Sequence, residues 1–490
     1  MDTVSKEALS AKTKDLFAGM VVYKDPQRYR FFSALGVPSY MRDWLVMRLA
    51  DEQGKLDSEA VQHFVEQYFP RRDQWELLKS EMMTNGRPVR FLAKLRVELD
   101  VASKEAFFSL PDFGFPSRRA EALVDNRVVR DWQAELLGAA ETWGVVDLEW
   151  RQLGIAGRPA EGHIVMVGFK PFRPYQVDLN FYQQVRNEFS LQEWVDLLLT
   201  AVDYSPAGFS EARQKLALLS RLLPFVEKRL NIIELAPKGT GKSTMFSQIS
   251  KYGWLVSGGS VGRVSLFYDK RRRLPGLVSR CDYVALDEIQ SISFADEDEV
   301  KGALKGYLES GEYRIADYKG LGEAGLVLLG NIDEADMNES VNMFLTLPEV
   351  FHESALIDRF HGFIRGWDIP RMRENMKASG WGLNVEYLSD ILHCLRDDLR
   401  YRAIIDERLR VPRGADTRDT EAIKRLATAW LKLLFPGALH AGISTDDLEH
   451  YCLAPARQMR ATIRRQLSVM DSEYSSGVPD ITCLEAAEPS

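Results

Sequence analysis

The 490-residue chain is poor in cysteine and contains no long hydrophobic run. Its four cysteines are Cys281, Cys394, Cys452 and Cys483, and no two of them have the C-x-x-C spacing of a zinc knuckle. A disulfide framework is therefore not expected, and a reducing, cytoplasmic compartment is favoured. No run of about 18 apolar residues could cross a membrane, and the charged N-terminus lacks the apolar core of a signal peptide.

An excess of positive charge is also missing. The chain carries 63 lysines and arginines against 71 acidic residues, a net charge of −8. This balance excludes a protein that coats nucleic acid with an evenly basic surface, but it is compatible with a local basic channel. The composition is 45% hydrophobic and 27% charged, which is typical of globular proteins, and the length predicts about three domains.

Hydrophobic periodicity predicts an α/β domain flanked by helical regions. Apolar residues at helical spacing dominate both ends of the chain, and short apolar strands alternate with helices in between. Alternating apolar residues after the first helices predict a small β-rich domain, either an OB-like barrel or another small β-fold. The expected divisions are a helical N-terminal domain at 1–85, the β-rich domain at 86–175, a helical linker at 176–228, an α/β domain with a parallel sheet at 229–375, a helical lid at 376–475 and a loose tail at 476–490.

The α/β domain begins with a stretch typical of a phosphate-binding loop. Residues 234–246 read ELAPKGTGKSTMF, in which Ala236 replaces the usual first glycine. An apolar strand precedes the loop and a helix-forming run follows it, so that backbone N–H groups would face phosphates. We expect Lys242 to reach the β- and γ-phosphates and Ser243 to bind Mg²⁺. The predicted cofactors are ATP and Mg²⁺, and the predicted nucleotide-binding residues are Pro237, Lys238, Gly239, Thr240, Gly241, Lys242, Ser243 and Thr244.

Two later apolar strands end in polar side chains. Residues 283–288, YVALDE, end in Asp287 and Glu288, and GLVLLGNI at 325–332 contains Asn331. Asp287 fits a Mg²⁺ ligand, and Glu288 fits the base that orients an attacking water. Asn331 could hydrogen-bond the γ-phosphate or that water. Each residue alone is also typical of an ordinary strand end or turn, but their order behind the loop favours catalysis.

Two arginines complete the predicted site. Arg359, in ESALIDRF, could reach the nucleotide of a neighbouring subunit as an arginine finger. Arg418, at the start of a predicted helix, could contact the γ-phosphate of its own subunit, and Arg425 is a rival for that role. A loop lysine, an acidic pair, an asparagine and two arginines in this order form the layout of an AAA+ ATPase. Such ATPases usually work as rings, because one subunit completes its neighbour's site.

Longer segments resemble the AAA+ core of the BrxL family, the Lon-like ATPases of BREX phage-defence systems. They include NIIELAPKGTGKS, PGLVSRCDYVALDEIQ and ESALIDRFHGFIRGWDIPR, and DTRDTEAIKRLATAWLKLLFP follows the core. The resemblance covers most of 170–470 and is looser over 1–170. By the family's likeness to helicase motors of the minichromosome-maintenance type, it implies hexameric rings, sometimes stacked as dodecamers, that encircle DNA.

The resemblance is to a short form of that family. Fuller-length members carry a Lon-protease-like domain after the ATPase, and this chain ends near residue 490 without a Ser–Lys dyad context. We therefore expect ATP hydrolysis and no protease activity.

Two basic segments are predicted to contact DNA. A hairpin expected within GEYRIADYKGLGEAG carries Arg314, Tyr318 and Lys319, and FYDKRRRLPG carries Lys270, Arg271, Arg272 and Arg273. Their phosphate contacts would be independent of base sequence. A solvated basic loop is an equally good interpretation of such a charge run.

The sequence thus predicts a ring-forming AAA+ ATPase that clamps, translocates on or remodels double-stranded DNA in antiphage defence. The alternatives are an AAA+ protein remodeller and an ATP-gated scaffold that recruits effector partners. Protein remodellers usually place an aromatic–apolar pair in the pore loop, so the basic hairpin around Tyr318 favours DNA. Other copies of the chain and other defence proteins are the expected protein partners, and no membrane is expected.

Overall fold

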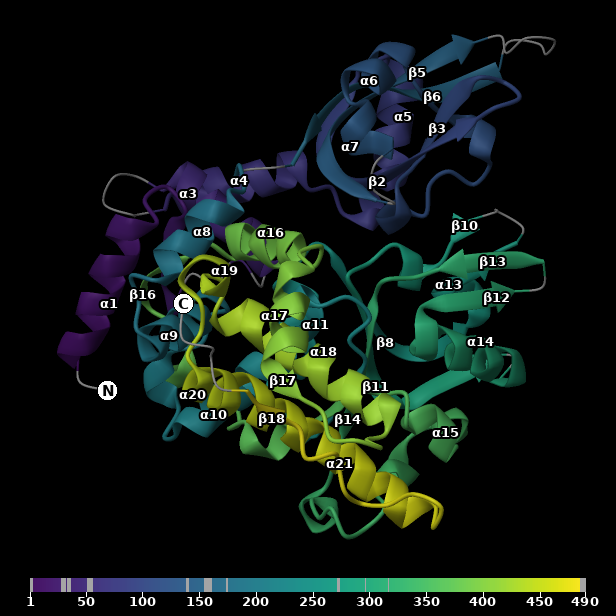
Figure 1. Ribbon diagram of the computed structural model, residues 1–490. Coiled ribbons are helices and arrows are strands. Elements are labelled where there is room, and N and C mark those ends of the chain that lie inside the picture. Colours follow the sequence, from purple (N-terminus) through teal and green to yellow (C-terminus); the bar gives the residue numbers. More distant parts are fainter. Residues whose placement is uncertain are drawn as a thin grey trace. The chain divides into compact units, whose positions relative to one another are not determined.

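The computed structural model describes residues 3–27, 32, 37–50, 56–137, 141–153, 161–172, 175–270, 274–295, 297–315 and 317–484. The chain divides into two compact units (Figure 1). The larger unit contains Met1–Trp44 and Val177–Ser490, and the barrel unit contains Leu45–Gln176. None of the helices in these ranges is long and apolar enough to span a membrane. No disulfide joins the four cysteines, all of which lie in described segments.

The barrel unit is built around a closed five-stranded barrel. Its strand order is β2-β3-β4-β6-β5, and every pair is antiparallel except β4–β6. Inward-facing apolar residues such as Phe91, Leu95 and Met166 fill the interior. The strands are β2 (Val89–Asp100), β3 (Glu105–Ser109), β4 (Ala122–Val124), β5 (Thr142–Leu153) and β6 (Glu161–Pro171), with α6 (Asn126–Asp131) and α7 (Gln133–Leu137) between β4 and β5.

The barrel unit begins earlier than the expected boundary at residue 86. It includes α4 (Ser58–Tyr68) and α5 (Trp75–Asn85). The reason is packing, because Trp75 and Met82 of α5 belong to the same buried core as the barrel strands. The β-rich character of the region was therefore predicted, but the helix that covers its core was assigned to the preceding domain.

The larger unit contains a five-stranded parallel sheet, as the sequence predicts. Every residue of β7 is buried, as in strands that are covered on both faces. The strands, in spatial order, are β15 (Gly362–Arg365), β7 (Ile232–Ala236), β14 (Gly325–Asn331), β11 (Tyr283–Ala295) and β8 (Gly253–Gly262), and all pairs are parallel. Ala236, Asp287 and Asn331 therefore share the carboxyl edge of the sheet.

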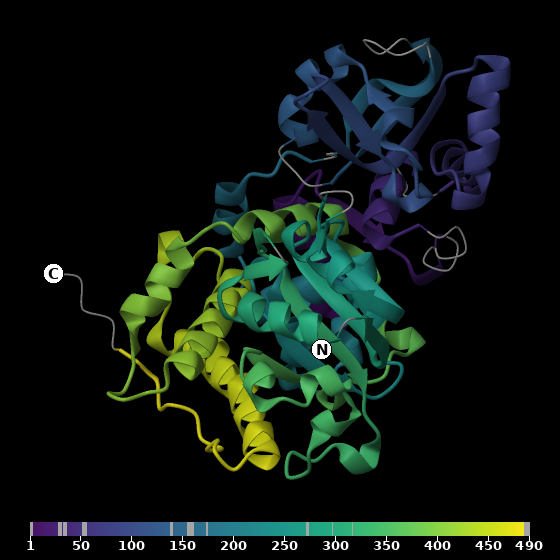
Figure 2. The ribbon, with the colours of Figure 1, turned by 90° about the vertical axis from the view of Figure 1, so that its right-hand side faces the viewer.

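Helices surround this sheet, and beside it α18 packs against both α17 and α21 (Figures 1 and 2). The helices of the larger unit, including α3, which ends in the barrel unit, are α1 (Thr3–Leu16), α3 (Ser39–Leu49), α8 (Leu179–Arg186), α9 (Leu191–Ala201), α10 (Ala212–Leu219), α11 (Leu223–Val226), α12 (Lys242–Gln248), α13 (Arg263–Leu266), α14 (Glu297–Ser310), α15 (Ser354–Ile357), α16 (Val385–Leu395), α17 (Arg400–Arg408), α18 (Thr417–Leu434), α19 (Ala438–Ala441), α20 (Thr445–Asp447) and α21 (Ala454–Met470). Short strands outside the main sheet are β1 (Val21–Lys24), β9 (Tyr268–Asp269), β10 (Leu274–Pro275), β12 (Glu312–Ile315), β13 (Tyr318–Leu321), β16 (Gly380–Leu383), β17 (Leu409–Arg410) and β18 (Thr482–Cys483).

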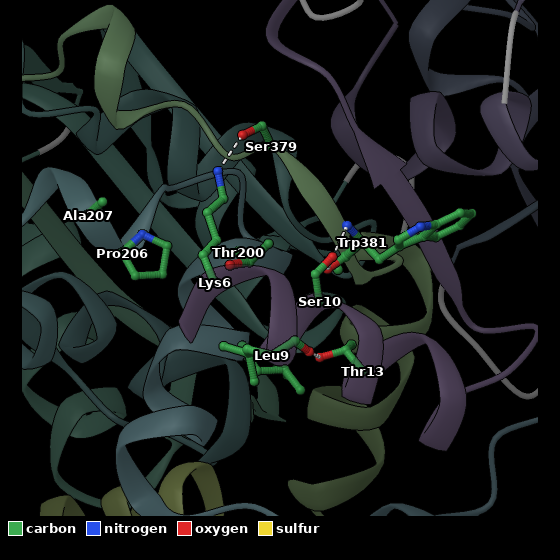
Figure 3. Close-up of a pocket in the computed structure, with 11 residues that line it drawn as sticks. Lys6, Leu9, Ser10, Thr13, Thr200, Pro206, Ala207, Ser379 and Trp381 are labelled. Atoms are coloured by element: carbon green, nitrogen blue, oxygen red, sulfur yellow. Dashed lines mark hydrogen bonds between the residues drawn. The ribbon is translucent and has the colours of Figure 1, made fainter. Parts of the chain in front are cut away.

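The first 44 residues belong to the larger unit and not to a separate N-terminal domain. Strand β1 pairs antiparallel with β16, with Val21 opposite Leu383. Helix α1 lies against the same segment, where Lys6 Nζ donates to Ser379 Oγ at 2.6 Å (Figure 3). These residues border a mostly apolar cavity of about 170 Å³, and no candidate catalytic residue lines it. The helical pattern expected over residues 1–85 does not hold at β1, whose partner strand lies more than 300 residues away in the sequence.

The C-terminal segment is more ordered than the expected loose tail. Strand β18 pairs with β17, and Ile481 beside it is fully buried. Arg457 Nη1 also donates to the Ile481 carbonyl at 2.8 Å. An apolar contact and two short strands thus fix the described part of this segment, and residues 485–490 lie outside the described ranges.

Candidate functional site

The predicted phosphate loop connects β7 to α12 at the carboxyl edge of the sheet. Gly239 and Gly241 have φ angles of +84° and +77°, a conformation that favours glycine. A Cβ on Gly241 would also collide with the Tyr204 hydroxyl. Ala236, by contrast, continues β7 and pairs with Asn331. Because that position is part of the strand and not of the turn, alanine fits it and the loop is intact.

Lys242 lies under the loop and contacts Asn331. Its Nζ donates to Asn331 Oδ1 at 3.0 Å and to the Ala236 carbonyl at 3.3 Å. Burial lowers the pKa of Lys242, while the charges of Asp287 and Glu288 act in the opposite direction. The structure therefore brings the loop lysine, the acidic pair and the asparagine into one site, as the sequence order predicts.

The acidic pair occupies an irregular point in β11. The register with β8 shifts between Asp287 and Ile292, and Glu288 has a φ of +50°. For a residue other than glycine this conformation costs of order 1 kcal/mol, and such strain is concentrated at functional sites. Asp287 is only 4% exposed and accepts a hydrogen bond from the Glu288 amide at 3.0 Å, whereas the Glu288 side chain faces solvent. The bulge thus separates a buried carboxylate from an exposed one.

Gln290 is a site residue that sequence reasoning missed. Its Nε2 donates to the Asn331 carbonyl at 2.7 Å, and its Oε1 accepts from the Asn331 amide at 3.3 Å. These two hydrogen bonds hold the end of β14 next to β11. A signal was present, because Gln290 lies two residues after Glu288 in an apolar strand and so faces the same way.

Arg221 and Glu234 form a second missed feature beneath the loop. Both side chains are completely buried, and Arg221 Nη2 lies 2.6 Å from Glu234 Oε1. Arg221 Nη1 also donates to the Thr240 carbonyl at 2.8 Å. The ion pair between Arg221 and Glu234 of β7 thus anchors the middle of the phosphate loop. No local sequence pattern indicates this ion pair, because α11 and a loop separate Arg221 from β7.

Arg359 and Arg418 lie at the other edge of the sheet. Arg359 precedes β15, where the His361 amide donates to the Asn231 carbonyl just before β7 begins. The length of β7, five residues, separates this amino edge from the phosphate loop by roughly 16 Å. Arg359 and Arg418 are brought together, but neither is brought to Lys242. This placement does not support the predicted contact between Arg418 and the γ-phosphate of its own subunit.

A polar cavity of about 430 Å³ surrounds these arginines. Arg359 Nε lies 2.8 Å and Arg418 Nη2 3.0 Å from the same atom, Glu309 Oε2. Arg425, the rival for the role of Arg418, lines this cavity and donates from Nη1 to the Lys228 carbonyl at 2.8 Å. The cavity therefore contains both arginine candidates and the rival.

The first basic segment forms the expected hairpin. Strands β12 and β13 pair antiparallel, with Arg314 opposite Lys319 and both side chains exposed. Lys319 Nζ lies 2.9 Å from Glu312 Oε2. The Tyr318 ring stacks on Tyr268, with 3.6 Å between centroids and 6° between planes.

The second basic segment is described only in part. Lys270 is exposed next to β9, whereas the predicted contacts Arg271, Arg272 and Arg273 lie outside the described residues. The Tyr268–Tyr318 stack joins this segment to the hairpin, so the two predicted DNA segments are neighbours.

The donor set at the carboxyl edge fits a magnesium nucleotide. Ser243 and Asp287 carry hydroxyl and carboxylate oxygens, and Mg²⁺ prefers oxygen ligands. Among the described residues there is no group of three or more histidine, cysteine, aspartate or glutamate side chains that could hold a metal ion without other ligands. A magnesium ion at Ser243 and Asp287 would therefore need phosphate oxygens to complete its shell, as in nucleotide sites.

Comparison with known proteins agrees with this geometry. Residues 164–479 match the family model described as "Lon-like protease BrxL-like, ATPase domain", and residues 15–150 match "BREX system Lon protease-like protein BrxL N-terminal". The Lon-like protease BrxL of Escherichia coli O9:H4 (strain HS) is 29% identical over 465 residues, which cover 94% of this chain and 64% of that protein. The Lon-like protease BrxL of Bacillus cereus (strain H3081.97) is 28% identical over 469 residues, covering 94% and 67%. The chain thus spans about two thirds of the length of these curated relatives.

Proposed function

Because the chain belongs to the BrxL-like ATPase family, we propose that it is a ring-forming, DNA-binding AAA+ motor that hydrolyses Mg·ATP in antiphage defence. One observation carries the proposal: the candidate site is divided between two edges of a single sheet. Lys242 and Asn331 lie at the carboxyl edge, and Arg359 and Arg418 lie at the amino edge. A complete site then needs two subunits.

The residues at the carboxyl edge have separate roles in this proposal. Lys242 binds the β- and γ-phosphates and exchanges its contact with Asn331 for them. Ser243 and Asp287 hold Mg²⁺, which neutralises charge on the phosphate oxygens. Glu288 faces solvent and orients the attacking water, and Asn331, held by Gln290, fixes the position of that water or of the γ-phosphate.

The arginines serve the neighbouring subunit. A guanidinium that stabilises charge on the transferred phosphoryl group can be supplied from another subunit. Because both Arg359 and Arg418 face one cavity at the amino edge, we assign both of them to the neighbour's nucleotide. This assignment replaces the expected contact of Arg418 within its own subunit. A closed hexamer, alone or as a stacked dodecamer, is the assembly proposed from the family resemblance.

Two features support DNA as the substrate of the motor. The barrel has the strand order of an OB-fold, with helices between its third and fourth strands, and OB-folds commonly bind oligonucleotides. The hairpin β12–β13 carries Arg314 and Lys319 on its exposed side, as a pore loop that contacts phosphates would. The proposal covers ATP hydrolysis and not proteolysis, since the matched domain model is that of the ATPase.

The proposal is tested by measuring ATP turnover with and without double-stranded DNA. We expect DNA to stimulate turnover, Lys242→Ala to abolish it, and electron microscopy to show closed rings with ATP. Turnover that responds to unfolded polypeptide and not to DNA would identify a protein remodeller. DNA-independent, slow turnover with a stably bound partner protein would identify an ATP-gated scaffold.

A further inference from the structure

The cavity at the amino edge is rich in buried donors that lack acceptors. Its lining includes Arg229, Arg359, Arg418 and Arg425. The Nε atoms of the last three are buried and have no hydrogen-bond acceptor in the described part of the chain, and the contact of Arg359 Nε with Glu309 is not aligned for a hydrogen bond. Buried donors without acceptors carry a free-energy cost. An oxygen-rich anion in the place of Glu309 would offer Arg359 Nε an aligned acceptor.

Three of the four carboxylates in the cavity have structural roles. Asp358 Oδ1 lies 2.6 Å from Nη2 of the fully buried Arg460, and Asp358 Oδ2 accepts from Arg418 Nη1 at 2.5 Å. Asp416 accepts backbone hydrogen bonds at the start of α18, and Glu421 lies 2.9 Å from Arg402. These three carboxylates hold elements of the fold together and cannot turn out of the cavity without breaking those contacts.

Glu309 is different, because its contacts are with Arg359 and Arg418. No other hydrogen-bond or ion-pair partner of Glu309 is found within the described ranges. It lies one residue before the end of α14, and its side chain is 48% exposed. Glu309 can therefore turn into solvent by a rotamer change, without disturbing the core.

We propose that Glu309 is an internal placeholder for the polyphosphate of a nucleotide bound to a second copy of this chain. Its carboxylate neutralises Arg359 and is a second counter-charge for Arg418, which also pairs with Asp358, while the amino edge is open. It leaves when the phosphates of the neighbouring copy arrive. Docking of two copies then depends on nucleotide, because only an occupied neighbour supplies the anion that replaces Glu309. This inference rests on the proposed ring function. It adds a residue that sets the subunit concentration at which rings assemble.

The first experiment measures assembly by mass photometry over a range of subunit concentrations. It uses Glu288→Gln protein with ATP and Mg²⁺, so that hydrolysis does not limit the lifetime of the rings. Adding Glu309→Gln should lower the midpoint concentration of assembly by about two- to fivefold, because a competing exposed ion pair is removed. The matched control is Glu299→Gln, also on α14, whose side chain is 57% exposed and pairs with Arg263 outside the cavity. That control should leave the midpoint unchanged.

The second experiment asks whether the effect acts through the arginines. In an Arg359→Ala/Arg418→Ala background that still melts cooperatively, Glu309→Gln should no longer shift the midpoint. A midpoint that Glu309→Gln leaves unchanged or raises, or a shift that persists without the arginines, would overturn the placeholder role.

A third measurement does not depend on rings. Inorganic tripolyphosphate is titrated by calorimetry into Lys242→Ala protein, whose phosphate loop is disabled. Adding Glu309→Gln should tighten binding by about threefold or more, and unchanged affinity would contradict the inference. If wild-type protein forms no nucleotide-dependent rings while tripolyphosphate binding tightens, the ring proposal fails and the role of Glu309 as an anion placeholder stands.

Discussion

At the scale of single residues, the site depends on groups that no motif contains. Lys242, Asp287 and Asn331 follow from spacing, whereas the buried pair Arg221–Glu234 and the twofold contact of Gln290 with Asn331 do not. Each missed group acts through a neighbour and not on the nucleotide itself. For Arg221 and Glu234 this role depends on tertiary contact, which a local pattern cannot report. For Gln290 the strand alternation predicts the direction of the side chain but not its contact with Asn331.

Replacing Arg221 should strongly destabilise the larger unit. Arg221→Met leaves Glu234 completely buried without its cation, at an expected cost of about 3–5 kcal/mol in the free energy of unfolding. Chemical denaturation measures the change. The double variant Arg221→Met/Glu234→Leu should recover most of the loss, and equal instability of both variants would show that the pair acts through geometry and not charge.

Gln290 should affect turnover more than nucleotide binding. Gln290→Ala frees the end of β14, so Asn331 no longer holds its place beside the phosphate loop. We expect kcat for ATP to fall by about tenfold with little change in KM. Steady-state kinetics with saturating DNA provides the measurement. A raised KM with normal kcat would instead show that Gln290 contributes to the binding of ATP before the chemical step.

At the scale of elements, DNA contact by the hairpin β12–β13 can be tested at one exposed side chain, that of Lys319. The Lys319 side chain is 61% exposed, and within the described part of the chain its ammonium pairs only with Glu312 across the hairpin. Lys319→Gln should weaken DNA binding regardless of sequence. It should also reduce the slope of log affinity against log salt by about 1. Lys301→Gln on α14, whose partner is Glu353, is the control and should leave the slope unchanged.

The free energy of unfolding should depend on pH through a buried carboxyl that contacts the connection between α12 and β8. Lys251, in this connection, contacts Glu386 of α16, and burial raises the pKa of Glu386 to about 7 despite the opposing charge of Lys251. Because this carboxyl takes up a proton on folding, its contribution to stability is present below its unfolded pKa and is lost as pH rises toward 7.

Glu386→Gln, which imitates the protonated form, should therefore flatten the dependence of unfolding free energy on pH between about 4.5 and 7. Denaturation at several pH values checks this. An unchanged slope would mean that Glu386 remains ionised across the window.

The sequence predicts elements better than their partners. Short apolar runs identified β7, β14 and the first part of β11, because strands covered on both faces are mostly apolar. Glu234 of β7 is an exception, and Arg221 neutralises it. Two glycines and a lysine in the right order identified the loop. The pairing of β1 with β16 was not predicted, because it joins residues far apart in the chain. The inclusion of α5 in the barrel unit was not predicted either, because the sequence does not say which of two cores a helix covers.

At the scale of the whole molecule, the divided site predicts complementation between defective subunits. Lys242→Ala subunits lack a working loop but keep their arginines, and Arg359→Ala subunits have the opposite defect. Mixtures should regain part of the ATP turnover, since some interfaces combine an intact loop with an intact arginine. Turnover is measured against the mixing ratio at constant total protein. Rings that form in the mixture without any recovery would place Arg359 outside the neighbour's site.

The pairing of β1 with β16 also bears on how the chain folds during synthesis. Val21 leaves the ribosome about 360 residues before its partner Leu383, a delay of roughly 20–70 s at ordinary rates of translation. The barrel strands, which lie between them in sequence, can close well within that time. Meanwhile the N-terminal segment lacks β16 and Tyr387, although Phe181 and Phe189 can already cover part of Phe17, which is buried in the finished protein. The start of this chain is thus among the last parts to fold, and in the nascent protein it offers an apolar segment that a chaperone could bind.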